Sequence, residues 1–252
     1  MARATARRAV GAPGECRPTG ERVLDVACGP GLITLAAAQA VGAAGSVLGV
    51  DLSQAMVDAA SRRAVAAGAR NAGFARMDGE ALACVDASFD AALSSLGLMY
   101  MPAPERALVE RRRVLRPGGR AGILVWGERA RCGWAPLLEI VEDEVTSEVC
   151  PLFFHLGAGE ALLRACRAAG FVAVEQRRIA TTLAYIDDDV ACDAALLGGP
   201  VALAWSRFED TTRARVRARY LEAIAPWRDG TGYRVPAEFV VAFATRAAGD
   251  TA

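Results

Sequence analysis

Two aspartates beside a glycine turn form the pattern in this chain that is best suited to chemistry. Asp25 lies inside an apolar run, V-L-D-V, that leads directly into A-C-G-P-G-L. Asp51 ends the next apolar run, V-L-G-V-D. An apolar run followed by closely spaced glycines is typical of a buried strand, a tight turn where backbone approaches a ligand, and a helix. The stretch therefore predicts a cofactor site.

The turn could serve a dinucleotide or S-adenosylmethionine. A dinucleotide site needs a third glycine, which lets the helix pack closely on the strand, but here Gly29 and Gly31 are followed by Thr34 at that place. Asp51 fits both cofactors. Asp25 favours S-adenosylmethionine, because its carboxylate can accept hydrogen bonds from a cationic amino group or orient the amides of the turn, and it would repel a pyrophosphate.

Composition narrows the class of protein. The 29 basic and 29 acidic residues balance, so charge does not favour nucleic acid or an anionic membrane as a partner. The 7 cysteines form no C-x-x-C pair and are odd in number, which predicts reduced thiols in a cytoplasmic protein and no metal site. Glycines cut the uncharged stretch between Asp25 and Asp51, and the first residues lack a long apolar run, so neither a membrane span nor a secretory signal is expected.

Alternation of strands and helices predicts the fold class. The expected strands are 22–27, 46–50, 72–76, 89–94, 121–126, 172–185 and 233–244. The expected helices are 32–41, 54–67, 104–115, 134–145, 159–169 and two within 187–224, with 116–119 as a turn. Repeated β-α units imply an α/β, Rossmann-like, seven-stranded and mostly parallel sheet covered on both faces, with an antiparallel strand near the C-terminus. The charged residues of helix 104–115, including Glu105, Arg106, Glu110, Arg111 and Arg112, predict a solvated outer face.

The domain organisation follows from the same pattern. Residues 1–20, rich in Arg, Gly and Pro, predict a flexible N-terminal arm. Residues 21–252 predict one domain, with a cofactor-binding core at 21–126, substrate-lid helices at 127–156 and 186–231, and a final strand at 232–245.

Five ordered motifs carry a resemblance to a known family. They are V-L-D-V-A-C-G-P-G, V-L-G-V-D-L-S, M-D-G-E-A-L, F-D-A-A-L-S-S and V-L-R-P-G-G. Together they resemble the motifs of class I S-adenosylmethionine-dependent methyltransferases with a type 11/25 methyltransferase domain, and more narrowly the ubiquinone/menaquinone biosynthesis C-methyltransferases and their small-molecule relatives. The resemblance covers about 22–126 well and the rest loosely. It implies an enzyme that uses S-adenosylmethionine and releases S-adenosylhomocysteine.

For the methionine end of that cofactor, the resemblance implies contacts from the first strand, the turn and the fourth strand. Asp25 and the backbone of Ala27 and Gly29 would hold this end. Ala27 stands where relatives usually have the first glycine. The amides of the turn, with Gly31 at the start of the helix, would lie near the carboxylate. Ser94 would line the methionine at the end of the fourth strand.

For the nucleoside, the resemblance implies contacts further along the chain. Asp51 would accept hydrogen bonds from both ribose hydroxyls with its two oxygens. Leu52 and Met56 would pack against the adenine, with core packing as the competing interpretation of Met56. Asp78 and the Gly79 amide would contact the edge of the adenine.

The acceptor is the part that the sequence leaves open. Tyr100, Trp126 and Trp134 follow the fourth and fifth strands near the expected acceptor pocket, with core packing as the competing interpretation. In-line displacement of a methyl group asks mainly for alignment and exclusion of water, so no catalytic base is assigned. His155 is the single histidine, and its neighbours in F-F-H-L predict a packed, structural side chain.

Methyl transfer to a small-molecule acceptor is therefore the expected function, in a monomer or homodimer. A catalytically inactive S-adenosylmethionine-binding protein or partner subunit is the alternative, motivated by the short segment before Arg22. A nicotinamide oxidoreductase is a third possibility, to be rejected if the protein binds S-adenosylhomocysteine and ignores NAD.

Overall fold

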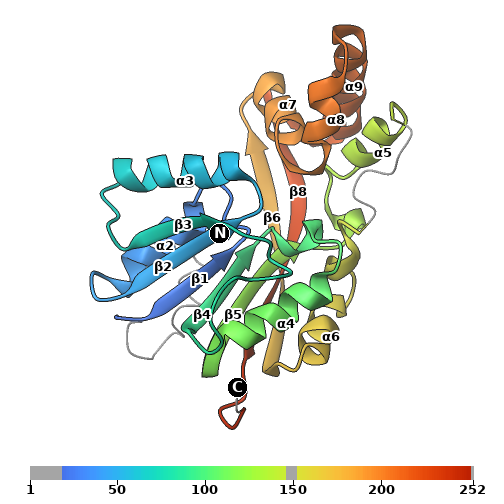
Figure 1. Ribbon diagram of the computed structural model, residues 1–252. Coiled ribbons are helices and arrows are strands. Elements are labelled where there is room, and N and C mark those ends of the chain that lie inside the picture. The colour runs from blue at the N-terminus through green and yellow to red at the C-terminus, as the bar shows by residue number, and fades with distance from the viewer. Residues whose placement is uncertain (1–18, 146–151, 251–252) are drawn as a thin grey trace. The chain divides into compact units, whose positions relative to one another are not determined.

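The computed structural model describes residues 19–145 and 152–250 (Figure 1). The chain divides into two compact units. The first contains the described residues of Met1–Val125, Glu160–Arg177 and Val240–Ala252, and the second those of Trp126–Gly159 and Arg178–Phe239. The predicted arm at 1–20 lies almost wholly outside the described residues.

A mixed sheet confirms the predicted α/β, Rossmann-like class. Its strands are β1 (Arg22–Val26), β2 (Ser46–Asp51), β3 (Ala72–Arg76), β4 (Phe89–Ser95), β5 (Leu115–Trp126), β6 (Val172–Tyr185), β7 (Arg228–Asp229) and β8 (Gly232–Thr245). They are ordered β3-β2-β1-β4-β5-β8-β6, and the short β7 pairs with β8. The pairs β1/β2, β1/β4, β2/β3 and β4/β5 are parallel, whereas β7/β8 is antiparallel. The order of the strands reverses between β1 and β4, which is where ligands bind in open sheets of this kind.

The core of the first unit explains why these segments are strands and helices. Helices α2 (Leu32–Val41) and α3 (Gln54–Ala66) pack on β1, β2 and β3. Val23 and Val47 from the strands share one buried cluster with apolar residues of α2, including Ile33, Ala37 and Val41. Apolar runs in a parallel sheet are buried on both faces, which is why these strands read as continuous hydrophobic segments.

The R-P-G-G segment corrects one prediction. Residues 116–119, expected to form a turn, belong to β5, which begins at Leu115. The pairing with β4 shifts its register between Phe89 and Ala91. Gly118 adopts a φ of 77°, and its N–H donates to the Arg246 carbonyl at 2.9 Å. A glycine with positive φ lets the strand pass through an irregularity and continue.

Helix α4 (Pro104–Val114) corrects a second prediction. Pro104, Ala107, Leu108, Arg111 and Val114 form its buried face, at the three- and four-residue spacing of a helix that packs on a core. Arg111 is fully buried and so does not belong to the solvated outer face that its charge predicts. Helix α6 (Ala161–Ala168) packs beside α4 in the first unit (Figure 1).

The second unit has more helices than expected. The helices described there are α5 (Pro136–Glu142), α7 (Asp188–Leu196), α8 (Ala202–Arg207) and α9 (Asp210–Ile224). Helix α5 is shorter than the predicted 134–145, and 187–224 holds three α-helices in place of two. The Gly198-Gly199-Pro200 segment ends α7 as proline and glycine usually do, but the extended Phe208 that separates α8 from α9 has no such signal. Among the described residues, no helix combines the length and apolar character needed to span a membrane.

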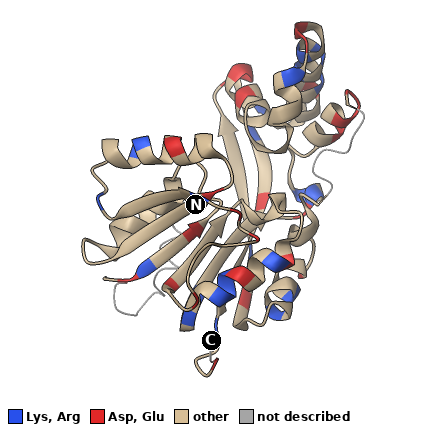
Figure 2. Ribbon diagram, viewed as in Figure 1, with Lys and Arg blue, Asp and Glu red and all other residues tan. Residues whose placement is uncertain are grey.

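Ion pairs connect α9 to its neighbours in the second unit. Basic residues lie along α9 (Figure 2). Arg219 pairs with Asp143 at 2.6 Å, Arg217 pairs with Asp189, and Arg215 pairs with a carboxylate that follows α5. These pairs are at least partly exposed, so each contributes little to stability and the apolar contacts of Val216 and its neighbours hold the helix in place.

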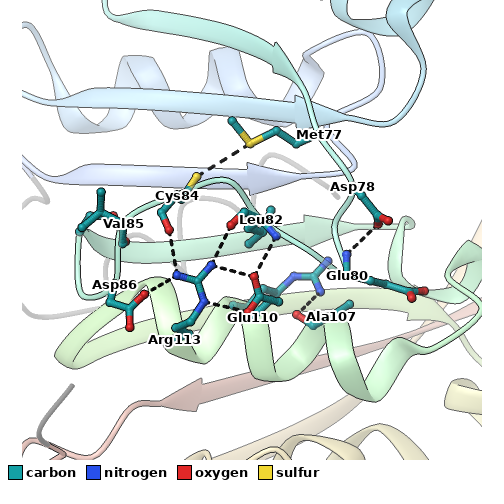
Figure 3. A network of polar contacts seen from close by, with 12 residues as sticks. Met77, Asp78, Glu80, Leu82, Cys84, Val85, Asp86, Ala107, Glu110 and Arg113 are labelled. Atoms are coloured by element: carbon teal, nitrogen blue, oxygen red, sulfur yellow. Dashed lines mark hydrogen bonds and ion pairs between the residues drawn. The ribbon is translucent and has the colours of Figure 1, made fainter.

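The connection from β3 to β4 is held by Arg113 of α4 (Figure 3). The Arg113 guanidinium donates to the carbonyls of Leu82 and Cys84, each at 2.8 Å, and pairs with Glu110 at 2.7 Å. Glu110 in turn accepts a hydrogen bond from the Leu82 N–H at 2.8 Å. This network fixes a segment without regular structure that begins with Asp78, one of the predicted site residues.

Arg113→Met is expected to lower the free energy of unfolding by about 1–3 kcal/mol, because it leaves several partly buried polar groups without partners. Urea unfolding at pH 7 measures the change. Arg106→Met is the matched control on the same helix, since Arg106 is exposed. An Arg113→Met protein as stable as the control would show that the network does not hold the β3–β4 connection.

Candidate cofactor site

The turn after β1 requires unusual backbone conformations. Ala27, Gly29 and Gly31 have φ values of 58°, 52° and 81°. Gly31 immediately precedes α2, and a Cβ there would lie 3.0 Å from the Cβ of Ala60 and 3.2 Å from the ring of Phe74. Glycine is therefore needed at Gly31 for both its conformation and its packing, whereas Ala27 adopts a conformation that costs a non-glycine residue energy. Such strain is characteristic of backbone that is shaped for a ligand.

Asp25 is a buried carboxylate with one oxygen unused. Its Oδ2 accepts a hydrogen bond from the Thr34 hydroxyl at 2.6 Å, while its Oδ1 has no partner in the described part of the chain. Burial raises the pKa of Asp25 from 3.8 to about 7. A cation that reached Oδ1 would satisfy this oxygen and favour the ionised form. Thr34 stands where a dinucleotide site would have its third glycine, and sequence reasoning did not anticipate its role.

Asp51 connects the end of β2 to the turn. Its Oδ2 accepts a hydrogen bond from the Gly29 N–H at 2.9 Å, and its Oδ1 accepts one from the Ser53 N–H at 2.9 Å. Within the described part of the chain, Asp51 and not Asp25 thus accepts a hydrogen bond from an amide of the turn. Each ionised oxygen can accept more than one hydrogen bond, so both remain able to receive a hydroxyl group.

The end of β4 packs against the turn. Ser94 is buried, and its Oγ has no hydrogen-bond partner among the residues described. Leu96 has a φ of 58°. A Cβ at Gly97 would lie 2.3 Å from the Ala27 Cβ and 3.3 Å from the Ser94 Oγ. Gly97 therefore lets β4 approach β1 closely, and no local sequence signal distinguished it from other loop glycines.

Gly97→Ala is expected to lower the free energy of unfolding by about 1–3 kcal/mol, because the added methyl overlaps Ala27. Urea denaturation measures the effect. Gly73→Ala is the control, because a Cβ at Gly73 in β3 would meet no atom within 4 Å. The close approach would be disproved by a Gly97→Ala protein with the stability of that control.

Two apolar side chains are exposed beside Asp51. Leu52 is 64% exposed and Met56 is 41% exposed. The exposure of Met56 excludes the interpretation that it is plain core. Beside them in the chain, Ser53 occupies the N-cap position of α3 without a capping bond from its hydroxyl. Together the two apolar residues offer a surface that a flat base could cover.

The segment after β3 is folded tightly. The Asp78 Oδ1 accepts a hydrogen bond from the Glu80 N–H at 2.9 Å, which shapes a local turn (Figure 3). Gly79 is buried, and a Cβ there would lie 2.6 Å from the Cε of Met101 and 2.9 Å from the Cγ1 of Val26. The Gly79 backbone is thus enclosed between β1 and the segment that follows β4.

The predicted acceptor residues divide between the units. Tyr100, in the 3-10 turn η1 (Leu98–Tyr100), is 42% exposed in the first unit. In the second unit, the Trp126 ring stacks on Phe239 with centroids 4.4 Å apart, and its centroid lies 5.0 Å from that of the buried Trp134. Both tryptophans thus take part in packing.

His155 corrects a prediction. It lies in the 3-10 turn η3 (His155–Gly157), which buries Leu156 and leaves His155 exposed. Leu156, its apolar neighbour in sequence, is buried while His155 is exposed, so the prediction of a packed, structural histidine is wrong.

All the predicted cofactor residues lie in the first unit, around the carboxyl ends of β1, β2, β3 and β4. Direct contacts join the turn to Asp51 and to the end of β4. The Asp25 Oδ1 and the Ser94 Oγ, which no described residue contacts by a hydrogen bond, are buried polar atoms that fit the amino-acid end of S-adenosylmethionine, and the two oxygens of Asp51 fit a ribose.

Comparisons with known proteins match this region. Residues 23–119 match the family model described as a methyltransferase domain. The chain is 37% identical over 102 residues to aklanonic acid methyltransferase of Streptomyces sp. (strain C5), covering 40% of this chain and 46% of that protein. It is 37% identical over 146 residues to the ubiquinone/menaquinone biosynthesis C-methyltransferase of Methylobacterium nodulans, covering 58% of this chain and 54% of that protein. The matches thus span about half the length of these relatives.

Solved structures show the same fold. The YcgJ protein of Bacillus subtilis has a TM-score of 0.62 at 19% identity, with 93% of this chain and 95% of that chain covered. Phosphoethanolamine N-methyltransferase 2 of Haemonchus contortus, solved with S-adenosyl-L-methionine, has a TM-score of 0.61 at 18% identity, with 98% of this chain and 52% of that chain covered. Residues 23–119 are therefore similar to a methyltransferase domain, and the ordered motifs and the fold resemble those of class I S-adenosylmethionine-dependent methyltransferases.

Proposed function

We propose that the chain binds S-adenosylmethionine at the site around the β1 turn and transfers its methyl group to a small-molecule acceptor. The observation that carries the proposal is the pair of carboxylates on either side of the glycine turn. Asp25 keeps a buried oxygen that has no partner among the described residues, and Asp51 holds the Gly29 amide with an oxygen that can still accept a hydroxyl. This arrangement suits a cationic amino acid joined to a ribose, and it disfavours a pyrophosphate.

Within this proposal, the residues divide by the part of the cofactor that they hold. Asp25, Ser94 and the backbone of Ala27, Gly29 and Gly31 hold the methionine end. The ribose is held by Asp51, and the adenine is bounded by Leu52, Met56, Asp78 and Gly79.

The bound cofactor supplies an electrophilic methyl group on a sulfonium. The chain would then hold the acceptor in line with that methyl and keep water away. This alignment would raise the rate of methyl transfer without a dedicated base. Tyr100, Trp126 and Trp134 stay the predicted acceptor residues, and the helices of 127–156 and 186–231 stay the predicted lid.

The class of acceptor is supported by the named relatives. Their names refer to aklanonic acid and to the biosynthesis of ubiquinone or menaquinone, which are small molecules. We propose an acceptor of this size, in a cytoplasmic monomer or homodimer. The free state of Cys28, Cys84, Cys132, Cys166 and Cys192 is consistent with a reducing compartment.

Methyl-labelled S-adenosylmethionine tests the proposed activity. The purified protein is incubated with the labelled cofactor and a fractionated small-molecule extract that includes reduced quinones, with the Asp51→Ala protein as the control. We expect label in at least one product from the wild-type protein and none above background from the variant. Tight binding of S-adenosylhomocysteine without label in any fraction would contradict methyl transfer and support the alternative of an inactive cofactor-binding protein.

A further inference from the structure

Arg111 is a buried cation whose contacts are uncharged. Its side chain is fully buried in α4. Its Nη1 donates to the Ala107 carbonyl at 2.9 Å, and its Nη2 lies 4.0 Å from the Met101 sulfur. Its Nε has no hydrogen-bond partner in the described part of the chain. Burial lowers the pKa of Arg111 to about 10, so it remains charged at neutral pH. Burying a charge in this way is costly, which calls for a role that an apolar side chain would not fill.

Met101 connects Arg111 to the adenine side of the proposed site. A Cβ at Gly79 would lie 2.6 Å from the Met101 Cε and 3.3 Å from its sulfur, so the methionine side chain rests directly against the Gly79 backbone. A second contact joins the same two segments, because the Ala103 N–H donates to the Glu80 Oε1 at 2.8 Å. The position of the Gly79 amide therefore depends on where Met101 is held.

We propose that Arg111 is a positioning residue for the adenine of the cofactor, acting through Met101 on the Gly79 backbone. Methionine is flexible and fills irregular space, so it needs support to hold a neighbour in one place. The Arg111 guanidinium, which is held by its hydrogen bond to the Ala107 carbonyl, supplies that support through its contact with the Met101 sulfur. The inference rests on the proposed function, in which Asp78 and Gly79 bound the adenine.

Arg111 also acts on a second part of the site. Its positive charge lowers the pKa of Asp25, although the larger effect of burial on that carboxyl is in the opposite direction. If the charge mattered only through Asp25, its removal would weaken every ligand with the same amino-acid end by the same factor. A role in positioning Gly79 predicts a loss that depends on the base.

The test compares two ligands that differ only at the base edge. Calorimetric affinities are measured for S-adenosylhomocysteine and for S-inosylhomocysteine, in which a 6-oxo group replaces the 6-amino group. The proteins are wild type, Arg111→Met, Met101→Ala and the control Arg106→Met, whose replaced side chain is exposed on the same helix. Thermal unfolding of each protein is recorded separately.

We expect wild type and Arg106→Met to prefer the adenine ligand by about tenfold or more, as one lost hydrogen bond to a charged group implies. In Arg111→Met the affinity for the adenine ligand falls about fivefold to twentyfold and the preference shrinks, and Met101→Ala changes in the same direction. If Arg111→Met does not fold, the affinities of Met101→Ala for the two ligands are compared with those of wild type instead. An equal loss for both ligands, or no loss, would overturn the inference. If wild type binds neither ligand, the proposed function fails, and the inference fails with it.

Discussion

Replacing Asp51 by alanine is expected to weaken the binding of S-adenosylhomocysteine by about 2–4 kcal/mol, roughly 30-fold to 1,000-fold in Kd. The carboxylate has two roles that alanine loses together. It would bind the ribose hydroxyls, and it holds the Gly29 N–H at 2.9 Å and so shapes the turn around the methionine end. Isothermal titration calorimetry at pH 8 measures the change.

The control for this variant is Asp58→Ala. Asp58 lies one turn into α3, and its Oδ1 accepts a hydrogen bond from the exposed side chain of Gln54 at 2.8 Å. Its removal changes the charge of the protein by the same amount without touching the turn, so we expect Kd to change less than threefold. An unchanged Kd for Asp51→Ala would show that the ribose is not where the site places it.

As the pH is raised toward 7, the affinity of the wild-type protein for S-adenosylhomocysteine is expected to increase about tenfold per pH unit. Above pH 7 the affinity is expected to level off. The buried Asp25 has a pKa of about 7, so it is mostly protonated at pH 5.5 to 6.5 in the absence of ligand. The cationic amino group favours the ionised carboxylate, and binding must therefore release a proton in that range. Arg111 lowers the pKa of Asp25 and Asp51 raises it, but the effect of burial exceeds both.

The Asp25→Asn variant tests whether Asp25 is the group whose ionisation causes this pH dependence. At pH 8 the variant is expected to bind S-adenosylhomocysteine about 2–3 kcal/mol more weakly, because a charge-assisted hydrogen bond is lost. Its affinity should no longer depend on pH between 5.5 and 7. Calorimetry in buffers of different ionisation enthalpy counts the released protons. A variant that keeps the wild-type pH dependence would rule out Asp25 as the titrating group.

Asp25→Asn weakens ligand binding, but it is expected to stabilise the ligand-free protein at pH 8. In the unfolded chain Asp25 ionises near its ordinary pKa of 3.8, whereas in the ligand-free fold it keeps its proton until about pH 7. The contribution of Asp25 to stability is therefore full below about pH 4 and is lost as the pH rises to about 7. Asp25→Asn removes this loss, so at pH 8 the ligand-free variant should unfold at a higher temperature than wild type. Weaker binding in a more stable protein could not be attributed to misfolding.

Much of the first unit follows from local patterns. The bounds of α2 at Leu32–Val41 and of β3 at Ala72–Arg76 agree with prediction, because glycines and charged residues flank short apolar segments there. Asp25 could be found because it lies inside such a segment just before the glycine turn, and Asp51 because it ends the next one. The reversal of strand order between β1 and β4 follows from the α/β class itself.

The remaining features depend on contacts between distant residues. Gly97 looks like an ordinary loop glycine until β4 is packed against Ala27. Thr34 marks the loss of a dinucleotide motif, but its bond to Asp25 appears only when α2 packs on the sheet. The charge of Arg111 predicts a surface position, whereas its helical spacing with Ala107 and Leu108 places it on the buried face. In that case periodicity was the better guide than residue type.

A single titration tests the central claim that this site is built for S-adenosylmethionine. The wild-type protein is titrated at pH 8 with S-adenosylhomocysteine and, separately, with NAD. We predict saturable binding of S-adenosylhomocysteine at one site per chain and no binding heat with NAD. Binding of NAD together with no binding of S-adenosylhomocysteine would contradict the assignment of the site.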